Sequence, residues 1–213
     1  MPLIVFYTFF LVFSVIHDST SCLLHLLLLA ELFVHSSSHP THSSPLCGTF
    51  RSMIHQVDKL TSLPKKLHDL TDDGDLFEGV ENRLDSLPKM QHTAAHFNSL
   101  KVNESLSQLF EFSQSFRLHV EWLKTAKENF SLSSQSAEDA SSHLLQLSNL
   151  VNASLSQMEE EVPQSPSPSL PVASTAFDVL QFSVEISKRL QVFCDWSKRI
   201  LLLLQRLSHC HKH

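Results

Sequence analysis

The sequence has few residues whose types and spacing could do catalytic or metal chemistry. A His-Cys-His-Lys-His run occupies residues 209–213, and imidazole and thiolate are good ligands for soft metals. We interpret the run as an exposed tail beyond a helix end and predict no metal site. The acidic run 72–75 is similar to part of a calcium loop, but the required glycine and distal glutamate are misplaced. None of the 14 histidines lies in a nucleophile signature, so we predict neither an enzyme nor a cofactor.

Glycine is scarce, with 3 residues in 213, where about 7% is ordinary. Loops that bind phosphates or dinucleotides need several closely spaced glycines, so those chemistries are excluded. The turn dipeptides of tight hairpins are also nearly absent, which argues against a sheet-rich fold. The net charge is -6, whereas a nucleic-acid surface needs a basic excess on one face. We therefore predict a helical protein that binds neither nucleic acid nor a small-molecule substrate.

Two apolar runs, at residues 3–16 and 22–34, precede the first basic residue. A short polar stretch separates them, so neither reaches the ~20 apolar residues of a membrane-spanning helix. We predict a signal peptide over residues 1–38, followed by a disordered N-terminal segment at 39–48. An uncleaved anchor is the alternative, because the start of the leader lacks the usual positive charge.

Three Asn-X-Ser sequons follow the leader, at Asn103, Asn129 and Asn152. Each one alone is weak evidence, since the pattern recurs by chance. Three sequons behind a leader predict a glycosylated protein that is secreted into the extracellular space.

Apolar residues recur with the period of a helix in four segments after the leader. Pro64 should kink or divide the first of them, because proline breaks the hydrogen bonding of a helix interior. We predict helices over residues 49–70, 102–127, 134–161 and 175–208, within one domain at 49–209 that a short tail follows at 210–213.

The lengths of the three connections predict how the helices are threaded. The link at 128–133 is short and fits a simple reversal. The connections at 71–101 and 162–174 are long enough to run the length of a bundle, as a link between parallel helices requires. We therefore predict an all-α fold: a long-chain four-helix bundle, up-up-down-down, with two long crossover connections.

The cysteines provide a check on this topology. Cys22 falls in the predicted leader, so the remaining three allow one disulfide at most. In the predicted bundle the first helix begins, and the fourth ends, at the same pole. Cys47 and Cys210 flank those two points, so we predict that they pair. Cys194 lies ~24 Å further along its helix.

Three short sequence blocks lie in order on these predicted elements. LDSLP at 84–88 lies in the first long connection, HVEWL at 119–123 near the end of the second helix, and DWSKRILLLL at 195–204 in the fourth. Together with the proline-rich third connection, they resemble the interleukin-11 cytokines of the interleukin-6 family. The resemblance covers about residues 50–207 and is weak in the first and third helices. It implies a secreted cytokine, monomeric when free.

The resemblance also implies partners and surfaces. An interleukin-11 receptor alpha-like chain would bind the C-terminal part of the fourth helix, and a glycoprotein 130-like transducer would then trigger JAK-STAT signalling. At ~100° per residue, most candidates for the alpha-receptor site face outward, with the tryptophan on the flank; they are Asp195, Trp196, Arg199, Leu202 and Arg206. The alternative is a solvated pair of Asp195 with Arg199, beside a half-buried Trp196.

Phe177 is the candidate for the site that the transducer contacts at the bundle tip. It points away from the core face at the start of the fourth helix, where the family has a tryptophan. The alternative is a hydrophobic staple against the preceding connection. Trp122 also lies outside the core face of its helix. We favour a role in capping the end of the bundle over a role in receptor binding. A second transducer site would use the first and third helices, but residues 131–161 lack the Lys and Arg of mammalian-type members, so we assign no residue to it.

One alternative function follows from the residues alone: a secreted lipid- or membrane-surface-binding helical bundle protein. Such a protein needs a basic border along its apolar helix faces. The third predicted helix has no basic residue, and two long crossovers would serve no purpose there.

Overall fold

The structure, a computed structural model, describes residues 46–68, 84–164 and 167–210. Within these ranges there are helices and no strand, so the predicted all-α class holds for this part of the chain. The helices are α2 (Leu46–Thr61), α3 (Pro64–Leu67), α4 (Ala94–Asn98), α5 (Val102–Asn129), α6 (Gln135–Gln157) and α7 (Ala176–Leu207). The predicted signal peptide at 1–38, the acidic run 72–75 and residues 211–213 lie outside the described residues.

The first predicted helix, 49–70, is divided into α2 and α3. The division lies at Pro64, the first residue of α3, where a missing N–H costs nothing because no acceptor would face it. α2 begins at Leu46, three residues before the predicted start, so the predicted disordered segment does not extend to residue 48. The short α4 was not predicted; Thr93 caps it by accepting the N–H of His96 at 3.2 Å.

Two residues after the end of each of α5, α6 and α7 lies a left-handed residue that is not glycine. These residues are Ser131, Glu159 and His209, with φ of 56°, 58° and 53°. In each case the next residue donates its N–H to a carbonyl five positions back, which closes the last turn. The prediction for α6 ran to residue 161 because it missed this turn, which stops the helix at Gln157.

α7 begins with a reciprocal cap. Asp178 donates its N–H to Thr175 Oγ1 at 3.1 Å, and Asp178 Oδ2 accepts the N–H of Thr175 at 2.9 Å. This capping box satisfies two backbone donors that would otherwise lack a partner in the first turn. It fixes where the longest helix of the described chain starts and which residues its first turn presents.

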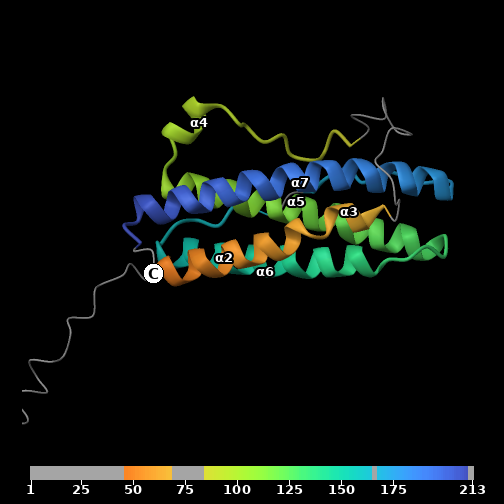
Figure 1. Cartoon of the computed structure of the whole chain (residues 1–213), viewed down its shortest axis with the longest axis horizontal. Helices are drawn as coiled ribbons and strands as arrows, with labels where there is room; N and C mark the ends of the chain where they lie inside the picture. The colour runs from red at the N-terminus through yellow and green to blue at the C-terminus, as the bar shows by residue number, and fades with distance from the viewer. Residues whose placement is uncertain (1–45, 69–83, 165–166, 211–213) are drawn as a thin grey trace, which may run out of the picture. The chain divides into compact units, whose positions relative to one another are not determined.

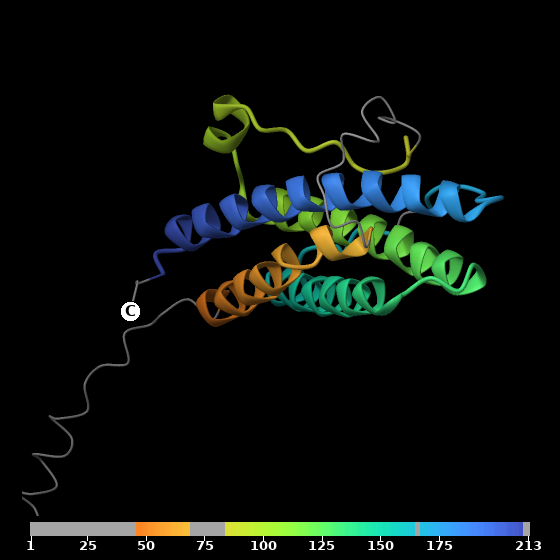
Figure 2. The same cartoon turned by 45° about the vertical axis from the view of Figure 1, so that its right-hand side comes forward.

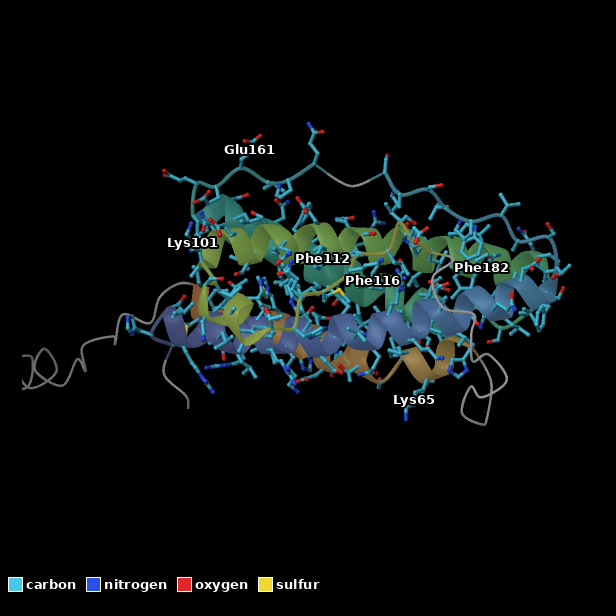
Figure 3. The ribbon with its side chains drawn as sticks, turned by 90° about the horizontal axis from the view of Figure 1, so that it is seen from above. Lys65, Lys101, Phe112, Phe116, Glu161 and Phe182 are labelled. Carbon is cyan, nitrogen blue, oxygen red and sulfur yellow. A yellow bond between two sulfur atoms is a disulfide. The ribbon has the colours of Figure 1, made fainter. Side chains whose placement is uncertain are left out.

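Four long helices pack around one core (Figures 1 and 2). α2 packs against α6 and α7, and α5 packs against the same two helices. In Figure 1, α2 and α5 run from left to right, whereas α6 and α7 run from right to left. Aliphatic and aromatic side chains from all four helices are buried between them; from above, Phe112 and Phe116 lie between α5 and α7 (Figure 3).

A disulfide joins Cys47, in the first turn of α2, to Cys210, just after α7. Their Cα atoms are 5.5 Å apart across a sequence separation of 163. This is the pairing that the sequence predicts. Cys194 is buried and free, and burial raises the pKa of its thiol to about 12. The bond ties the first turn of α2 to the end of α7.

Candidate functional site

A regular row of exposed side chains follows α7 from its middle to its end. Its members recur at alternating steps of four and three residues, which keeps them on one face of a helix; they are Lys188, Val192, Asp195, Arg199, Leu202 and Arg206. We call this set the α7 row. Val192 is 41% exposed and Leu202 38%, so aliphatic surface lies between charged groups. Protein interfaces combine apolar contact with charges that set specificity in this way.

Asp195 and Arg199 are exposed neighbours in the α7 row. Gln191 Nε2 lies 3.5 Å from Asp195 Oδ1. Among the residues that the structure describes, no ion pair joins Asp195 to Arg199. The solvated pair that the sequence left open is therefore not formed, and both side chains point their charges outward.

Trp196 does not belong to this surface. Its side chain is fully buried, with its ring 5.2 Å from that of Phe112 and 6.4 Å from that of Phe193. The sequence placed it on the flank of the helix, where either burial or exposure was possible. The adjacent α5 decides the outcome, because its Phe112 packs against the indole. The prediction of Trp196 as an alpha-receptor contact on the flank of the helix is corrected accordingly: it is a core residue.

The segment after residue 83 is held to α7 by a buried polar cluster. Leu84 donates its N–H to Glu185 Oε1 at 3.1 Å. Arg189 Nη1 donates to the carbonyls of Leu84 at 2.7 Å and Leu87 at 3.3 Å, and Arg189 Nη2 lies 3.5 Å from Glu185 Oε1. Ser187 Oγ donates to the carbonyl of Pro64 at 2.7 Å. The bonds of Glu185 and Arg189 satisfy backbone groups of a segment that forms no helix or strand, whereas that of Ser187 joins α7 to α3.

His119 ties the same segment to α5 and to the third connection. Its Nδ1 lies 2.8 Å from the carbonyl oxygen of Ser115, and its Nε2 lies 2.8 Å from Ser86 Oγ. Because a carbonyl only accepts, Nδ1 carries a proton. Ser86 Oγ also lies 2.9 Å from the carbonyl of Ser169. Burial is the main cause that lowers the pKa of His119, so the neutral ring is favoured.

The start of α7 exposes an aromatic side chain. Phe177 is 57% exposed and lies in the helical turn that the capping box fixes. In the connection before it, Leu170 is 41% and Val172 87% exposed. The end of the third connection and the beginning of α7 thus present apolar side chains to solvent.

Trp122, the other tryptophan, is half-buried on α5. Its ring meets that of Phe182 edge-on at a centroid distance of 5.5 Å. An edge-to-face pair of this kind adds to the packing energy of the two rings. The contact supports the capping role that we favoured over binding.

The three sequon asparagines have different surroundings. Asn129, the last residue of α5, and Asn152, within α6, are exposed. Asn103, in the first turn of α5, is half-buried and donates from Nδ2 to Glu160 Oε1 at 3.0 Å.

α6, the helix of the unassigned second site, carries no Lys or Arg. His143 Nδ1 on α6 lies 3.0 Å from Gln56 Oε1 on α2. Leu145 is the large apolar side chain that α6 exposes, at 43%. These observations define no row of exposed side chains on α6 comparable to the α7 row, so the second site stays without assigned residues.

The described residues offer no metal site, since no three His, Cys, Asp or Glu side chains among them come close enough together. Within the same residues, no helix combines the length and the apolar character that crossing a membrane requires.

Sequence reasoning missed two features of this region. Lys188 and Val192 belong to the α7 row, and their places seven and three residues before Asp195 could have identified them. The polar cluster around Glu185 and Arg189 joins residues about a hundred positions apart, and no periodicity signals such a contact.

In a comparison with protein families, the model of the interleukin 11 family matches residues 40–208. The matched range includes every described residue except His209 and Cys210. No curated protein is significantly similar to the chain.

Proposed function

This chain belongs to the interleukin 11 family of cytokines, and we propose that it is a ligand which binds an alpha receptor and recruits a glycoprotein 130-like transducer to start JAK-STAT signalling. Members of this family are cytokines and not enzymes. The observation that carries the proposal is the α7 row. It lies on the C-terminal part of the fourth helix, where the resemblance leads us to expect the alpha-receptor site.

The proposed topology is the up-up-down-down bundle with two long crossover connections. It is supported by the directions of the four long helices in Figure 1 and by the disulfide between the start of α2 and the end of α7. Each helix then has antiparallel neighbours, as in the long-chain cytokines. Part of the first crossover lies at 69–83, outside the described residues.

We assign alpha-receptor binding to the exposed members of the α7 row. Arg199 and Arg206 supply positive charge, Asp195 supplies negative charge, and Leu202 supplies apolar contact beside them. Arginine is among the residue types that most often carry binding energy. Val192 extends the surface towards the middle of the helix, and Trp196 supports it from inside by packing on α5.

We assign the transducer's tip site to Phe177. An exposed aromatic ring on a turn fixed by a capping box loses little conformational freedom on binding, which favours its use as an anchor. We assign no residue to the second transducer site, which would use the first and third helices.

The chain is further proposed to be secreted and glycosylated. The proposed signal peptide covers residues 1–38, the cytokine domain 49–209, and the acceptor sites are Asn103, Asn129 and Asn152. The disulfide is consistent with an oxidising compartment.

The alpha-receptor assignment is tested by Arg199→Ala. We expect affinity for the immobilised alpha-receptor ectodomain to fall more than tenfold while the far-ultraviolet circular dichroism spectrum stays the same. Lys65→Ala is the matched control: it removes an exposed cation that belongs to α3 and not to the α7 row, and should leave affinity intact. Unchanged affinity in the Arg199 variant would remove the assignment.

The tip assignment has a separate test. Phe177→Ala should retain alpha-receptor affinity and lose signalling in cells that carry both receptors. A variant that still signals at full strength would contradict the role of Phe177 without affecting the assignment of the α7 row.

A further inference from the structure

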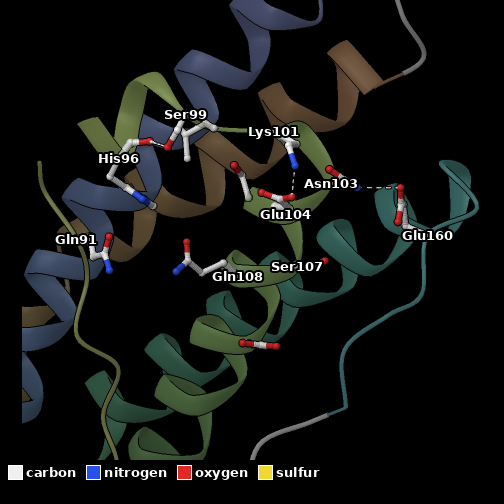
Figure 4. Close-up of a pocket in the computed structure, with 12 residues that line it drawn as sticks. Gln91, His96, Ser99, Lys101, Asn103, Glu104, Ser107, Gln108 and Glu160 are labelled. Atoms are coloured by element: carbon white, nitrogen blue, oxygen red, sulfur yellow. Dashed lines mark hydrogen bonds and ion pairs between the residues drawn. The ribbon is translucent and has the colours of Figure 1, made fainter. Parts of the chain in front are cut away.

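A polar groove of about 650 Å³ lies beside the N-terminal part of α5 (Figure 4). One wall is the face of α5 that carries Asn103, Ser107 and Glu111, which recur every four residues. The segment before α5 contributes Gln91 and His96, and the connection after α6 contributes Glu160. The groove is therefore lined by three separate stretches of chain.

Two buried polar atoms of this groove lack a partner among the described residues. They are the hydroxyl oxygen of Ser105, whose residue is 2% exposed, and Nε2 of His96. A buried polar group without a hydrogen bond costs about 1–3 kcal/mol. The groove is therefore lined mainly by polar side chains, which suits a ligand with hydroxyl and amide groups better than an apolar one.

The charges of the lining favour a neutral ligand over an anion. The groove has carboxylates at Glu104, Glu111 and Glu160 and a lysine at Lys101. That lysine lies 2.6 Å from Glu104, so its charge is already opposed. Sugar hydroxyls donate readily to carboxylates and amide oxygens, and an acetamido group both donates and accepts.

Asn103 lines the groove and is also the acceptor asparagine of the sequon that Ser105 completes. A glycan attached to Asn103 would therefore begin in the groove. Asn103 Nδ2 donates to Glu160 Oε1 at 3.0 Å (Figure 4). An asparagine amide has two hydrogens. Glycosylation replaces one of them, so the modified amide keeps one hydrogen with which it can donate to Glu160.

We propose that the N-glycan of Asn103 lies in this groove, with its first N-acetylglucosamine against α5 and the segment 91–100. In the transfer, a bond forms between Asn103 Nδ2 and C1 of the sugar while the bond from C1 to a lipid pyrophosphate carrier breaks. The carrier leaves as the lipid pyrophosphate, and the amide gives up one proton. The hydroxyl of Ser105 is presented while the chain is still unfolded, so its later burial does not oppose the reaction.

This inference rests on the proposed secretion and glycosylation, and it separates Asn103 from the other two sequons. Asn129 and Asn152 are exposed and are absent from the lining of the groove. Glycans there would extend into solvent. The glycan of Asn103 would instead link α5 to the segment that contains α4.

The test is site-resolved release of glycans from the folded protein, made in secretory cells, by an amidase that cleaves the bond between asparagine and sugar. We expect release from Asn103 to be at least tenfold slower than from Asn129 and Asn152 in the folded protein. After denaturation the three rates should be similar. Equal rates in the folded protein, or an unmodified Asn103, would overturn the inference, and receptor affinity measured on the same sample would show separately whether the cytokine assignment stands.

A second measurement uses Ser105→Ala, which abolishes the sequon, retains Asn103 and deletes a hydroxyl without a partner in the described structure. Amide hydrogen exchange of residues 91–100 should be faster in this variant than in the glycosylated protein. It should match that of the unmodified chain made in a bacterial host. Asn152→Gln is the control and should leave exchange in 91–100 unchanged. No difference between glycosylated protein and the Ser105 variant would contradict the placement of the glycan.

Discussion

The two parts of α7 differ in what covers them. From residue 181 to 187 every side chain is buried, since α3, the segment after residue 83 and α5 lie around that part of the helix. From Lys188 onward the helix buries only its inner faces and exposes the α7 row. The covered part fixes the helix within the molecule, which leaves the outer face of the second part available to a partner.

Asp195 and Trp196 show the same division within two residues. One side chain is exposed and the other is fully buried. Sequence adjacency therefore says little about role, and substitutions of the two should have opposite consequences.

Trp196→Ala should lower the free energy of unfolding by about 3–5 kcal/mol, because it leaves a large cavity between α5 and α7. Urea denaturation followed by circular dichroism measures this. Asp195→Ala, the neighbouring exposed substitution, should change the same quantity by no more than about 0.5 kcal/mol. A Trp196 variant with normal stability and weak receptor binding would show that the indole acts at the surface.

The disulfide should make the next largest contribution. Replacing Cys47 and Cys210 together by Ala should cost about 2–5 kcal/mol of unfolding free energy, since the bond restricts a long loop in the unfolded chain. Dithiothreitol should lower the stability of the original protein by a similar amount. The double variant should not respond to the reductant; if it did, the disulfide would not be the source of the effect.

Glu185→Ala tests the covered part of α7. It leaves the N–H of Leu84 without its acceptor and removes the carboxylate beside Arg189, so we expect a loss of about 1–3 kcal/mol. Lys188→Ala, one turn further along on the exposed side, should be close to neutral. Equal effects of the two substitutions in urea denaturation would erase the distinction between the covered and exposed parts.

The smallest effect concerns pH. Burial lowers the pKa of His119 in the folded protein, so the unfolded chain binds this proton more readily. The corresponding stability is complete above the ordinary histidine pKa of about 6.5 and is lost as pH falls towards the lowered value. The slope should not exceed about 1.4 kcal/mol per pH unit for one proton.

Stability measured between pH 7.5 and 5 should therefore decline less steeply in His119→Gln than in the original chain. His143, whose pKa burial also lowers, remains in that variant and supplies the residual slope. An identical pH dependence in both proteins would show that His119 does not titrate in this range.

Local signals made α7 predictable. Its regular apolar spacing gave the bounds 175–208, within one residue of those observed. The outward positions of Asp195, Arg199 and Leu202 followed from the helical period alone.

Long-range packing explains what the sequence could not predict. An angular position on the flank of a helix does not say whether a ring as large as that of Trp196 turns towards a neighbour. Bonds such as those of Glu185 to Leu84 and of Ser86 to Ser169 depend on the path of connections that have no period. α4 is only five residues long, too short for an apolar pattern.

The central claim is that the outer face of α7, and not another face of the bundle, binds the alpha receptor. Hydroxyl-radical footprinting of the chain, alone and with the alpha-receptor ectodomain, tests it most directly. We expect Val192 and Leu202 to be oxidised in the free chain and protected in the complex, while Phe177 and Leu145 are oxidised equally in both. Protection of Leu145 on α6 without protection of Leu202, or no complex at all, would contradict the account.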